Sequence, residues 1–517
     1  MKAFKPFRSP DAAVIKIKAE KRGLGSLRTL LTVFLIFLQL VILVSLYFTL
    51  AEVFPWYVGL SLGLSVACCI YTLSSDRSPS SKAVWVFILL IFFFVGHILF
   101  ILTDEKVFFY RSKKRYAKVF AKSEKYAGKS CPPSADKRCA EDCAYLEKVG
   151  RFSAYGEGNA RYFSSGGQFF DAVIEDLRRA EKFIFIEFFI IADGRLFERF
   201  LKELSRKAAG GVEVCVIYDD MGSHGKLSYK SKSRMKKRGI KLMSFNRLLP
   251  VIDVGLNYRD HRKIVVIDGK IAYTGGANLA DEYTNDKRMH GYWKDGGVRV
   301  EGGAAKGFAL MFLRQWEFLT RKSVEYENYL SGAEQPCAGE SVFVPFACGL
   351  DYDKPVAKEL LLNVIAKAQD RLYIMTPYLV PDDSIFNMLA NKAASGVDVK
   401  IILPAVPDKA VVYKVTLNNA HKLAERGVKI YLMGDSFVHS KIMLADYCAV
   451  IGSVNIDMRS FYQQFESALY TNDATVMDEV SADFTNTLEE CQTLSERKST
   501  PLNRVSAGLL KIISPLM

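Results

Sequence analysis

The chain has 517 residues, half of which are hydrophobic, and a formal net charge of +14. This length allows about three domains or fewer, and the apolar fraction is sufficient for a large core together with membrane segments. The basic balance disfavours a cationic partner and favours an anionic one, such as nucleic acid, an anionic lipid surface or a substrate that carries phosphate.

Three charge-free apolar runs follow a basic N-terminal segment, residues 1–28. The runs are 29–51, 53–75 and 83–103, and each is close to the ~20 residues that cross a bilayer as a helix. Their length and the long basic leader argue against a cleaved signal peptide. Three such runs in succession also argue against buried core helices. Residues 29–103 are therefore predicted to be transmembrane or membrane-associated helices, which favours anionic lipid over nucleic acid as the partner.

Basic residues flank this region on both sides, so the positive-inside rule places both of its ends in the cytoplasm. Three full spans would place the ends on opposite sides. The conflict disappears if the run 53–75 does not cross, and Pro55, Gly59 and Gly63 make it the best candidate. We expect a multi-pass protein of the cell membrane with two full spans, one shallow or re-entrant segment, and the rest of the chain on the cytoplasmic face. If all three runs cross, the denser basic flank leaves the N-terminus outside.

Residues 104–155 are rich in Lys and Arg and are predicted to be a basic linker near lipid headgroups. The linker contains a local group of three cysteines, Cys131, Cys139 and Cys143. A disulfide among them would require an oxidising compartment, and a zinc site would need a fourth ligand, with no histidine nearby. Free thiols are the third interpretation, and the sequence leaves the three open.

From residue 156 onward, helical and strand patterns alternate, and the order of elements is repeated. The stretch KAAGGVEVCVIYDD returns as KAASGVDVKIILPAVPD, and RGIKLMSFN returns as RGVKIYLMGD. The sequence therefore predicts two related α/β domains, 156–335 and 336–495, made by doubling one unit. The tail, residues 496–517, is predicted to be an amphipathic segment that lies on the membrane or packs against the second domain.

Each half contains one copy of a short phrase, NYRDHRKIVVIDGKIAYTGGAN at 257–278 and FVHSKIMLADYCAVIGSVN at 437–455. Each phrase is predicted to form a strand, a tight turn and a strand, with the His and Lys on one face because they are two residues apart. The returning strand brings an Asn back beside them. One copy would fit a polar surface hairpin equally well, but two copies favour a functional site. The residues concerned are His261, Lys263, Asp268 and Asn278 in the first copy, and His439, Lys441, Asp446, Ser453 and Asn455 in the second.

This pair of phrases suits exchange at a phosphodiester. The reaction needs a nucleophile on one side of phosphorus and a proton donor on the other, and histidine with a reference pKa of about 6.5 can fill either role. A covalent phosphohistidine would divide one difficult displacement into two easier steps. The two lysines, with Asn278, Asn455 and Ser453, would bind the phosphate oxygens and stabilise their charge. No metal and no cofactor is then required.

The two phrases match the H-x-K-x4-D motifs of the phospholipase D superfamily, and within it the chain resembles the bacterial cardiolipin synthases. The flanking phrases YDDMGS, GGANLADEY, GYWKDGGVRV, TPYLVPDD and GSVNIDMRSF support this resemblance. It implies two α/β halves about a pseudo-twofold axis, with the site at their seam. It also implies transfer of a phosphatidyl group from one phosphatidylglycerol to another, giving cardiolipin and glycerol. In that scheme His261 is the nucleophile and His439 the acid and later the base.

The same resemblance points to two further carboxylates. Glu466 in QQFESALY matches the family's acidic position after the second motif, and Asp295 in GYWKDGG is its candidate counterpart in the first half. Each would orient a histidine ring. Asp268 and Asp446 have either a chemical role or a role in bracing the turns.

The chain departs from the family pattern in two places. The second turn is one residue shorter than the first, and Gly296 and Gly297 stand where the family usually has Thr-His. Three alternatives remain: a phospholipase D-type hydrolase or nuclease, a phosphatidyltransferase that uses another acceptor alcohol, and a non-catalytic membrane scaffold.

Overall fold

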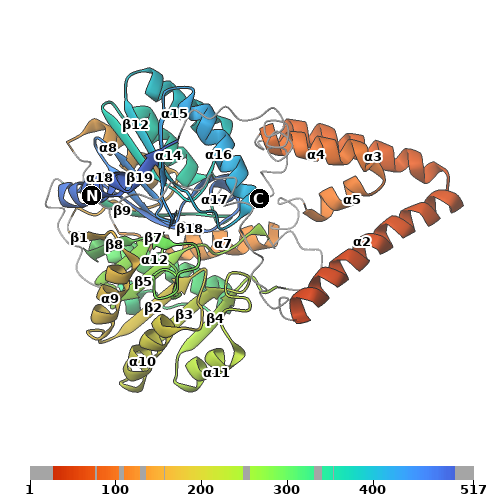
Figure 1. Ribbon diagram of the computed structural model, residues 1–517. Coiled ribbons are helices and arrows are strands. Elements are labelled where there is room, and N and C mark those ends of the chain that lie inside the picture. The colour runs from red at the N-terminus through yellow and green to blue at the C-terminus, as the bar shows by residue number, and fades with distance from the viewer. Residues whose placement is uncertain are drawn as a thin grey trace.

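The computed structural model describes residues 27–75, 79–103, 110–128, 135–156, 158–248, 257–330, 341–352 and 354–494. Two α/β halves pack against one another, and the N-terminal helices α2 to α5 extend from one side of them (Figure 1). The predicted basic segment 1–28 and the predicted tail 496–517 lie almost wholly outside the described residues, and the domain boundaries stay predictions.

The first half is built on a seven-stranded mixed sheet with the order β1-β8-β6-β5-β2-β3-β4. β2, β3 and β4 are parallel, and the other neighbours are antiparallel. Helices α9, α10 and α11 cover one face of the sheet, and α12 covers the other. Because both faces are buried, β2 has the nearly unbroken apolar run FIFIEF. The bounds are β1 Gly158–Phe163, α9 Gly166–Leu177, β2 Phe183–Phe188, α10 Arg195–Ala209, β3 Glu213–Asp219, α11 Tyr229–Lys237, β4 Lys241–Phe245, β5 Lys263–Ile267, β6 Ile271–Gly275, β8 Gly297–Gly302, α12 Gly303–Thr320 and α13 Glu327–Leu330.

The second half repeats this plan on an eight-stranded sheet with the order β19-β13-β12-β10-β15-β16-β18-β9. In both sheets the motif hairpin, β5–β6 or β15–β16, lies antiparallel to the first strand of the parallel set. This confirms the predicted doubling of one α/β unit. The bounds are β9 Phe343–Cys348, α14 Val356–Lys367, β10 Arg371–Met375, β11 Leu379–Val380, α15 Asp383–Ala394, β12 Asp398–Pro404, α16 Ala410–Ala424, β13 Lys429–Met433, β15 Ile442–Ala445, β16 Ala449–Gly452, β17 Ile456–Asp457, α17 Met458–Tyr462, β18 Glu466–Thr471, α18 Ala474–Glu489 and β19 Cys491–Thr493.

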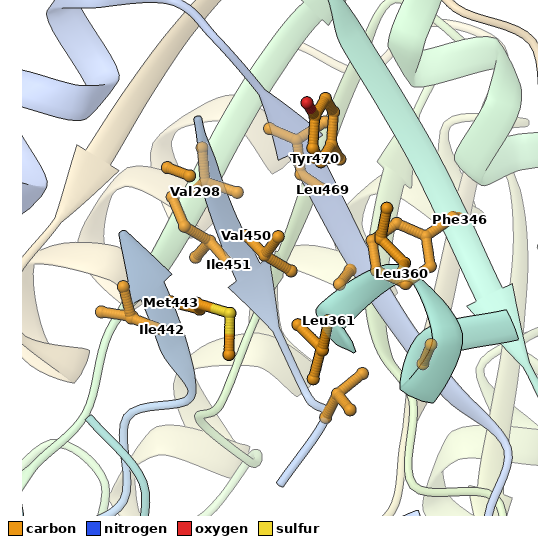
Figure 2. Packing of buried hydrophobic residues seen from close by; sticks show 14 of the residues in the cluster. Val298, Phe346, Leu360, Leu361, Ile442, Met443, Val450, Ile451, Leu469 and Tyr470 are labelled. Atoms are coloured by element: carbon orange, nitrogen blue, oxygen red, sulfur yellow. The ribbon is translucent and has the colours of Figure 1, made fainter. Parts of the chain in front are cut away.

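The two halves share one hydrophobic core. Figure 2 shows Val298 of the first half beside Ile451 of the second, and both belong to the same cluster of buried side chains. The backbones also meet, because β7 (Tyr292–Lys294) of the first half pairs in parallel with β14 (Ser436–Val438) of the second. The halves are therefore fixed relative to one another at the point where both motifs lie.

The N-terminal apolar region forms helices α2 (Leu27–Val53), α3 (Trp56–Ser74), α4 (Pro79–Ile91) and α5 (Phe93–Thr103). Among the described residues, α3, with 19 residues, is the helix long and apolar enough to cross a membrane. This differs from the expectation that the run 53–75 is the shallow one, because Gly59 and Gly63 lie within a continuous helix. The multi-pass arrangement and the number of spans stay predictions.

The predicted linker contributes two helices to the body of the protein. α7 (Tyr110–Ser123) packs against α12, and α8 (Lys137–Lys148) packs against α14. Cys139 and Cys143 are buried on α8 and form no disulfide, and Cys131 lies outside the described residues. Of the three interpretations of these cysteines, the described pair fits ordinary buried thiols.

Candidate active site

The two motif hairpins have the same internal geometry although their turns differ in length. β5 pairs with β6 so that Ile264 faces Thr274, which places Lys263 opposite Gly275. In the second hairpin Ile442 faces Ile451, and the amide of Gly452 donates to the carbonyl of Lys441. Each Lys is therefore opposite the glycine that precedes the Asn by three residues. The shorter second turn leaves Asn455 in the place that corresponds to Asn278.

The His261 ring is held by a carboxylate of the other half. Its Nδ1 lies 2.8 Å from Oε2 and 3.0 Å from Oε1 of Glu466, the first residue of β18. Its backbone amide donates to the carbonyl of Phe465 at 2.8 Å. Glu466 is fully buried and accepts hydrogen bonds from the Ser453 hydroxyl at 2.5 Å and from the Ser460 hydroxyl at 2.7 Å. Three donors thus fix this carboxylate against the histidine.

The His439 ring is held in the reciprocal way. Its Nδ1 lies 2.6 Å from Oδ2 of Asp295, which follows β7 of the first half, and its amide donates to the carbonyl of Lys294 at 2.7 Å. The space around the backbone of Gly276 and Gly296 is too small for a side chain. A Cβ on Gly276 would lie 2.2 Å from the Asp295 carboxylate, and one on Gly296 would lie 2.0 Å from the carbonyl of Phe163. Glycine at 296 is therefore a packing requirement of this chain, where the family usually has a larger residue.

The two lysines lie beside the histidines. Lys263 Nζ donates to the carbonyl of His261 at 2.6 Å, and Lys441 Nζ contacts the carbonyl of His439 and lies 2.8 Å from Nδ1 of His439. Both ammonium groups are buried. Burial lowers the pKa of Lys263 to about 7 and that of Lys441 to about 8, although carboxylates of both halves oppose the shift.

The two carboxylates and the two histidines of the site are buried as well, and this shifts their pKa values. Desolvation raises the pKa of Asp295 and of Glu466 to about 7 in each case. Desolvation also lowers the pKa of His261 and of His439 well below the usual value, and both lysines lower them further. Because Lys263 and Lys441 act on both rings, the two motifs form a single electrostatic site.

The expected phosphate-binding residues differ in what their side chains contact. Asn278 donates from Nδ2 to the Tyr283 hydroxyl at 2.6 Å and accepts from the amide of Ile190 at 3.1 Å. Asn455 is buried, and its side-chain oxygen has no hydrogen-bond partner among the described residues. The Ser453 hydroxyl is directed to Glu466, which favours a role in holding that carboxylate over the expected contact with phosphate. The phosphate-binding roles stay predictions.

Asp268 and Asp446 contact the backbone of neighbouring segments, which favours the bracing interpretation, and their catalytic role stays a prediction. Asp268 accepts hydrogen bonds from three consecutive backbone amides, those of residues 181–183, at 2.8–2.9 Å. Asp446 accepts from the amides of Gln369 and Asp370 and pairs with Arg138. Asp268 and Lys263 lie at opposite ends of β5, about 16 Å apart at the usual rise per residue. The carboxylate therefore cannot touch a phosphate held by Lys263.

Asp268→Ala is expected to lower the free energy of unfolding by about 2–4 kcal/mol, because three amides lose a charged acceptor. The turnover of the folded fraction should stay within about twofold, since no group of the site is touched. Urea unfolding of the variant together with kcat measured at low temperature tests both parts. A large loss of kcat with unchanged stability would support the catalytic role of Asp268 instead.

Sequence reasoning did not identify the buried charges next to the first motif. The Arg262 guanidinium lies 3.2 Å from the Asp351 carboxylate and 3.9 Å from that of Glu187, and all three are almost fully buried. Burial raises the pKa of Glu187 well above its usual value. The unusual NYRDHRK, which places two Arg and an Asp around one histidine, was the available signal. No described group of three or more His, Cys, Asp or Glu side chains could hold a metal ion, and the expectation of a metal-free reaction stays a prediction.

The lowered lysine pKa values give a testable pH dependence. Lys263 is charged below about pH 7 and loses its proton above it, so kcat/KM should fall as the pH rises through about 7 to 8. Lys263→Arg should move this alkaline limb to higher pH, because a guanidinium stays protonated, while the larger group lowers the maximum about tenfold. Measuring kcat/KM between about pH 6 and about pH 9 tests this. An unchanged alkaline limb in the variant would show that Lys263 does not cause it.

Comparison with known proteins agrees with the geometry of the site. A family model described as "Cardiolipin synthase, PLD-like domain" matches residues 173–289 and 361–488, one match in each half. A second, described as "Phospholipase D-nuclease N-terminal", matches residues 63–103. Among solved structures, the phosphatidylserine synthase of Haemophilus influenzae has a TM-score of 0.57 and 13% identity, with 73% of this chain and 99% of that chain covered. At that identity the likeness concerns the fold alone.

Sequence relatives extend over nearly the whole chain. An uncharacterised protein of Streptococcus mutans is 35% identical over 87% of this chain and 100% of its own length. The cardiolipin synthase of a Geobacillus species is 31% identical over 89% of this chain and 94% of its own length. The cardiolipin synthase of Alkalihalophilus pseudofirmus is 29% identical over 92% of this chain and 97% of its own length. With both motifs intact and matches in both halves, the chain belongs to the cardiolipin synthase family and is a phosphatidyltransferase of the phospholipase D type.

Proposed function

We propose that this chain makes cardiolipin by transferring the phosphatidyl group of one phosphatidylglycerol to a second, with release of glycerol. The observation that carries the proposal is the reciprocal pairing at the seam. Each histidine is oriented through Nδ1 by a buried carboxylate of the other half, His261 by Glu466 and His439 by Asp295. This leaves Nε2 of each ring for chemistry, in a site that also holds two buried lysines.

In the first step, Nε2 of His261 attacks the phosphorus of phosphatidylglycerol, and the bond from phosphorus to the glycerol oxygen breaks. At His261 both atoms near Nδ1 are carboxylate oxygens, so Nδ1 carries the proton and Nε2 has the free electron pair. Lys263, Lys441 and the side-chain amide of Asn455 stabilise the negative charge that develops on the phosphate oxygens.

The leaving glycerol oxygen takes a proton from Nε2 of His439. Lys441 lies 2.8 Å from Nδ1 of this ring, so it can donate to Nδ1 and leave the ring proton on Nε2. As Nε2 loses that proton, Nδ1 takes one from Lys441 or from Asp295, whose pKa values are about 8 and about 7. The difference between the two rings supports His261 as the nucleophile and His439 as the acid.

In the second step, the terminal hydroxyl of another phosphatidylglycerol attacks the phosphohistidine. His439 accepts the hydroxyl proton at Nε2 and returns its Nδ1 proton to Lys441 or Asp295, while the bond from phosphorus to His261 breaks and cardiolipin leaves. Both rings are only 7% exposed. Exclusion of water from the intermediate favours transfer to a lipid over hydrolysis, which is the reaction of the alternative phospholipase D-type enzyme.

The product formed from phosphatidylglycerol alone tests this function. The full-length protein in mixed micelles should give cardiolipin and glycerol in equal amounts, and His261→Ala should give neither. Phosphatidic acid as the main product would support the hydrolase instead. Addition of phosphatidylethanolamine, with product masses measured, tests the alternative acceptor. A folded protein that gives no product from any of these lipids would support the scaffold.

We further propose that the two halves work at the cytoplasmic face of the cell membrane, where anionic phospholipid is both the substrate and the surface. The apolar α3 and the basic α7 support this placement. Glu147→Cys on the exposed side of α8 should resist an impermeant thiol reagent in intact cells and react after permeabilisation. Labelling in intact cells, above the level of the parent protein, would contradict the cytoplasmic placement.

A further inference from the structure

Helix α7, the first described element after the apolar helices, lies between the two halves (Figure 1). Its Tyr116 is only 3% exposed. The ring stacks on Phe318 of α12 with centroids 3.6 Å apart, and the hydroxyl donates to the Gln315 side chain at 2.9 Å. On the same helix, the ring of Phe120 meets that of Tyr352 in the second half at 5.2 Å. α7 is therefore part of the protein core, although the sequence predicts a linker there.

Tyr116 also contacts the segment that holds the first histidine. Its ring centroid lies 5.8 Å from that of Phe465. The backbone of Phe465 forms two hydrogen bonds with the chain around His261. Its amide donates to the carbonyl of Arg259 at 2.9 Å, and its carbonyl accepts from the amide of His261 at 2.8 Å. The next residue is Glu466, whose carboxylate contacts the His261 ring. Phe465 thus connects both members of the His261–Glu466 pair.

The position of Phe465 depends on a few neighbours. Apart from Tyr116, its buried ring meets Phe245 at 5.2 Å, lies 5.3 Å from the guanidinium carbon of Arg262, and packs against the backbone of Gly349, where a Cβ would lie 2.5 Å from the ring. Phe245 and Arg262 belong to the first half, whereas Tyr116 comes from outside both halves. Loss of the Tyr116 ring would leave a void next to Phe465, into which the ring can move, since cores close only partly around such voids. A displacement of Phe465 moves the backbone that bears Glu466 relative to His261.

We propose that Tyr116 is a positioning residue for the His261–Glu466 pair, so that the segment joining the membrane region to the two halves sets the geometry of the nucleophile. This inference rests on the proposed roles of His261 and Glu466. Misplacement of a reacting group by about 1 Å costs roughly 100-fold in rate. Removal of the Tyr116 ring should therefore lower kcat about 10- to 100-fold, with KM for phosphatidylglycerol within about twofold.

The test compares Tyr116→Leu, Tyr116→Phe and Tyr126→Leu in the full-length protein. Tyr116→Phe keeps the ring and loses only the bond to Gln315, so it should keep at least about half of kcat. Tyr126 belongs to the same segment and stacks on Tyr326 at 5.3 Å, with no ring contact to Phe465, which makes it the matched control. Its variant should also keep kcat. Equal losses of kcat in Tyr116→Leu and Tyr126→Leu would show a general structural effect and overturn the proposal.

A double-mutant cycle separates positioning from general destabilisation. If Tyr116 acts through the pair, Tyr116→Leu should cause less than about a threefold loss in a Glu466→Gln background, because coupled residues are not additive. Full additivity would contradict the proposal. If Tyr116→Leu does not fold, Phe465→Leu, which removes the other ring of the contact, should show the same lack of additivity with Glu466→Gln. Wild-type activity in Glu466→Gln alone would instead refute the proposed function.

Discussion

Replacement of His261 or His439 by alanine is expected to lower cardiolipin synthesis by roughly 10⁴-fold or more, the size of effect seen when a nucleophile or its acid–base partner is removed. In the proposed scheme His261 forms the bond to phosphorus and His439 transfers the proton, so neither ring can substitute for the other. Both rings lie at the seam, where their loss removes little hydrophobic area, and expression and membrane attachment should be unchanged. The measurement is kcat in mixed micelles, with folding checked by the thermal unfolding of each variant.

His421→Ala on α16 is the matched control, because that partly exposed ring lies outside the motifs. It should leave kcat within about twofold, as surface substitutions away from a site usually do. If either motif variant retained a tenth of the activity of the parent, the two-histidine scheme would be wrong.

Glu466→Gln and Asp295→Asn should each lower kcat by about 10²- to 10⁴-fold. Glu466 sets the tautomer of His261, and Asp295 orients the His439 ring and exchanges a proton with its Nδ1. The reciprocal pairing gives each variant a distinct signature. Glu466→Gln should slow formation of the phosphohistidine, because Nδ1 of His261 loses its acceptor. Asp295→Asn, on the first half, should impair proton transfer by His439 of the second half. Single-turnover kinetics resolves the two steps.

Asp176→Asn serves as the control for loss of a buried carboxylate. Asp176 on α9 accepts from the Tyr273 hydroxyl at 2.6 Å and from Arg299 at 2.7 Å, and none of these groups touches either histidine. Its variant should lose stability and keep kcat. If Asp295→Asn slowed only the step at His261, the cross-pairing of the two halves would be incorrect.

Much of the site could be predicted from the sequence because its signals are local. Period-two spacing places His261 and Lys263 on one face of a strand, and the following hairpin returns Asn278 in a fixed register. The second copy of the phrase, with the repeated helix and strand patterns around it, indicates two halves and one shared site. Within each copy of the phrase, these features depend on residues within about twenty positions of one another, where backbone geometry decides the outcome.

The partners of these residues could not be predicted, because they are set by how the halves pack. Glu466 and Asp295 were expected near the histidines, but only the seam shows that each serves the histidine of the other half. Ser453 occupies a motif position at which contact with phosphate was expected, yet its hydroxyl donates to Glu466. Asp268 follows a predicted strand, and this sequence signal was open to two interpretations. In the structure its left-handed φ of 54° marks a turn, and its carboxylate accepts from the backbone amides of residues 181–183.

The N-terminal region shows the same limit. Charge-free runs predict apolar helices but not where those helices break, and the run 83–103 divides at Phe92 into α4 and α5. Basic composition predicted a linker for residues 104–155. Tyr116 and Phe120 instead bury one side of α7, since an amphipathic helix can keep its lysines exposed while its aromatic rings enter the core.

The covalent intermediate tests the account most directly. The full-length His439→Ala variant, given phosphatidylglycerol labelled in its acyl chains, should accumulate a phosphatidyl adduct that is stable in alkali and labile in acid. Peptide mapping should place the adduct on His261. Without His439 the first step lacks its acid and is slow, but the second step lacks its base, so the adduct that forms should persist. An adduct on His439 in the His261→Ala variant would reverse the two roles. Cardiolipin synthesis by the parent protein with no adduct in either variant would contradict a reaction through phosphohistidine.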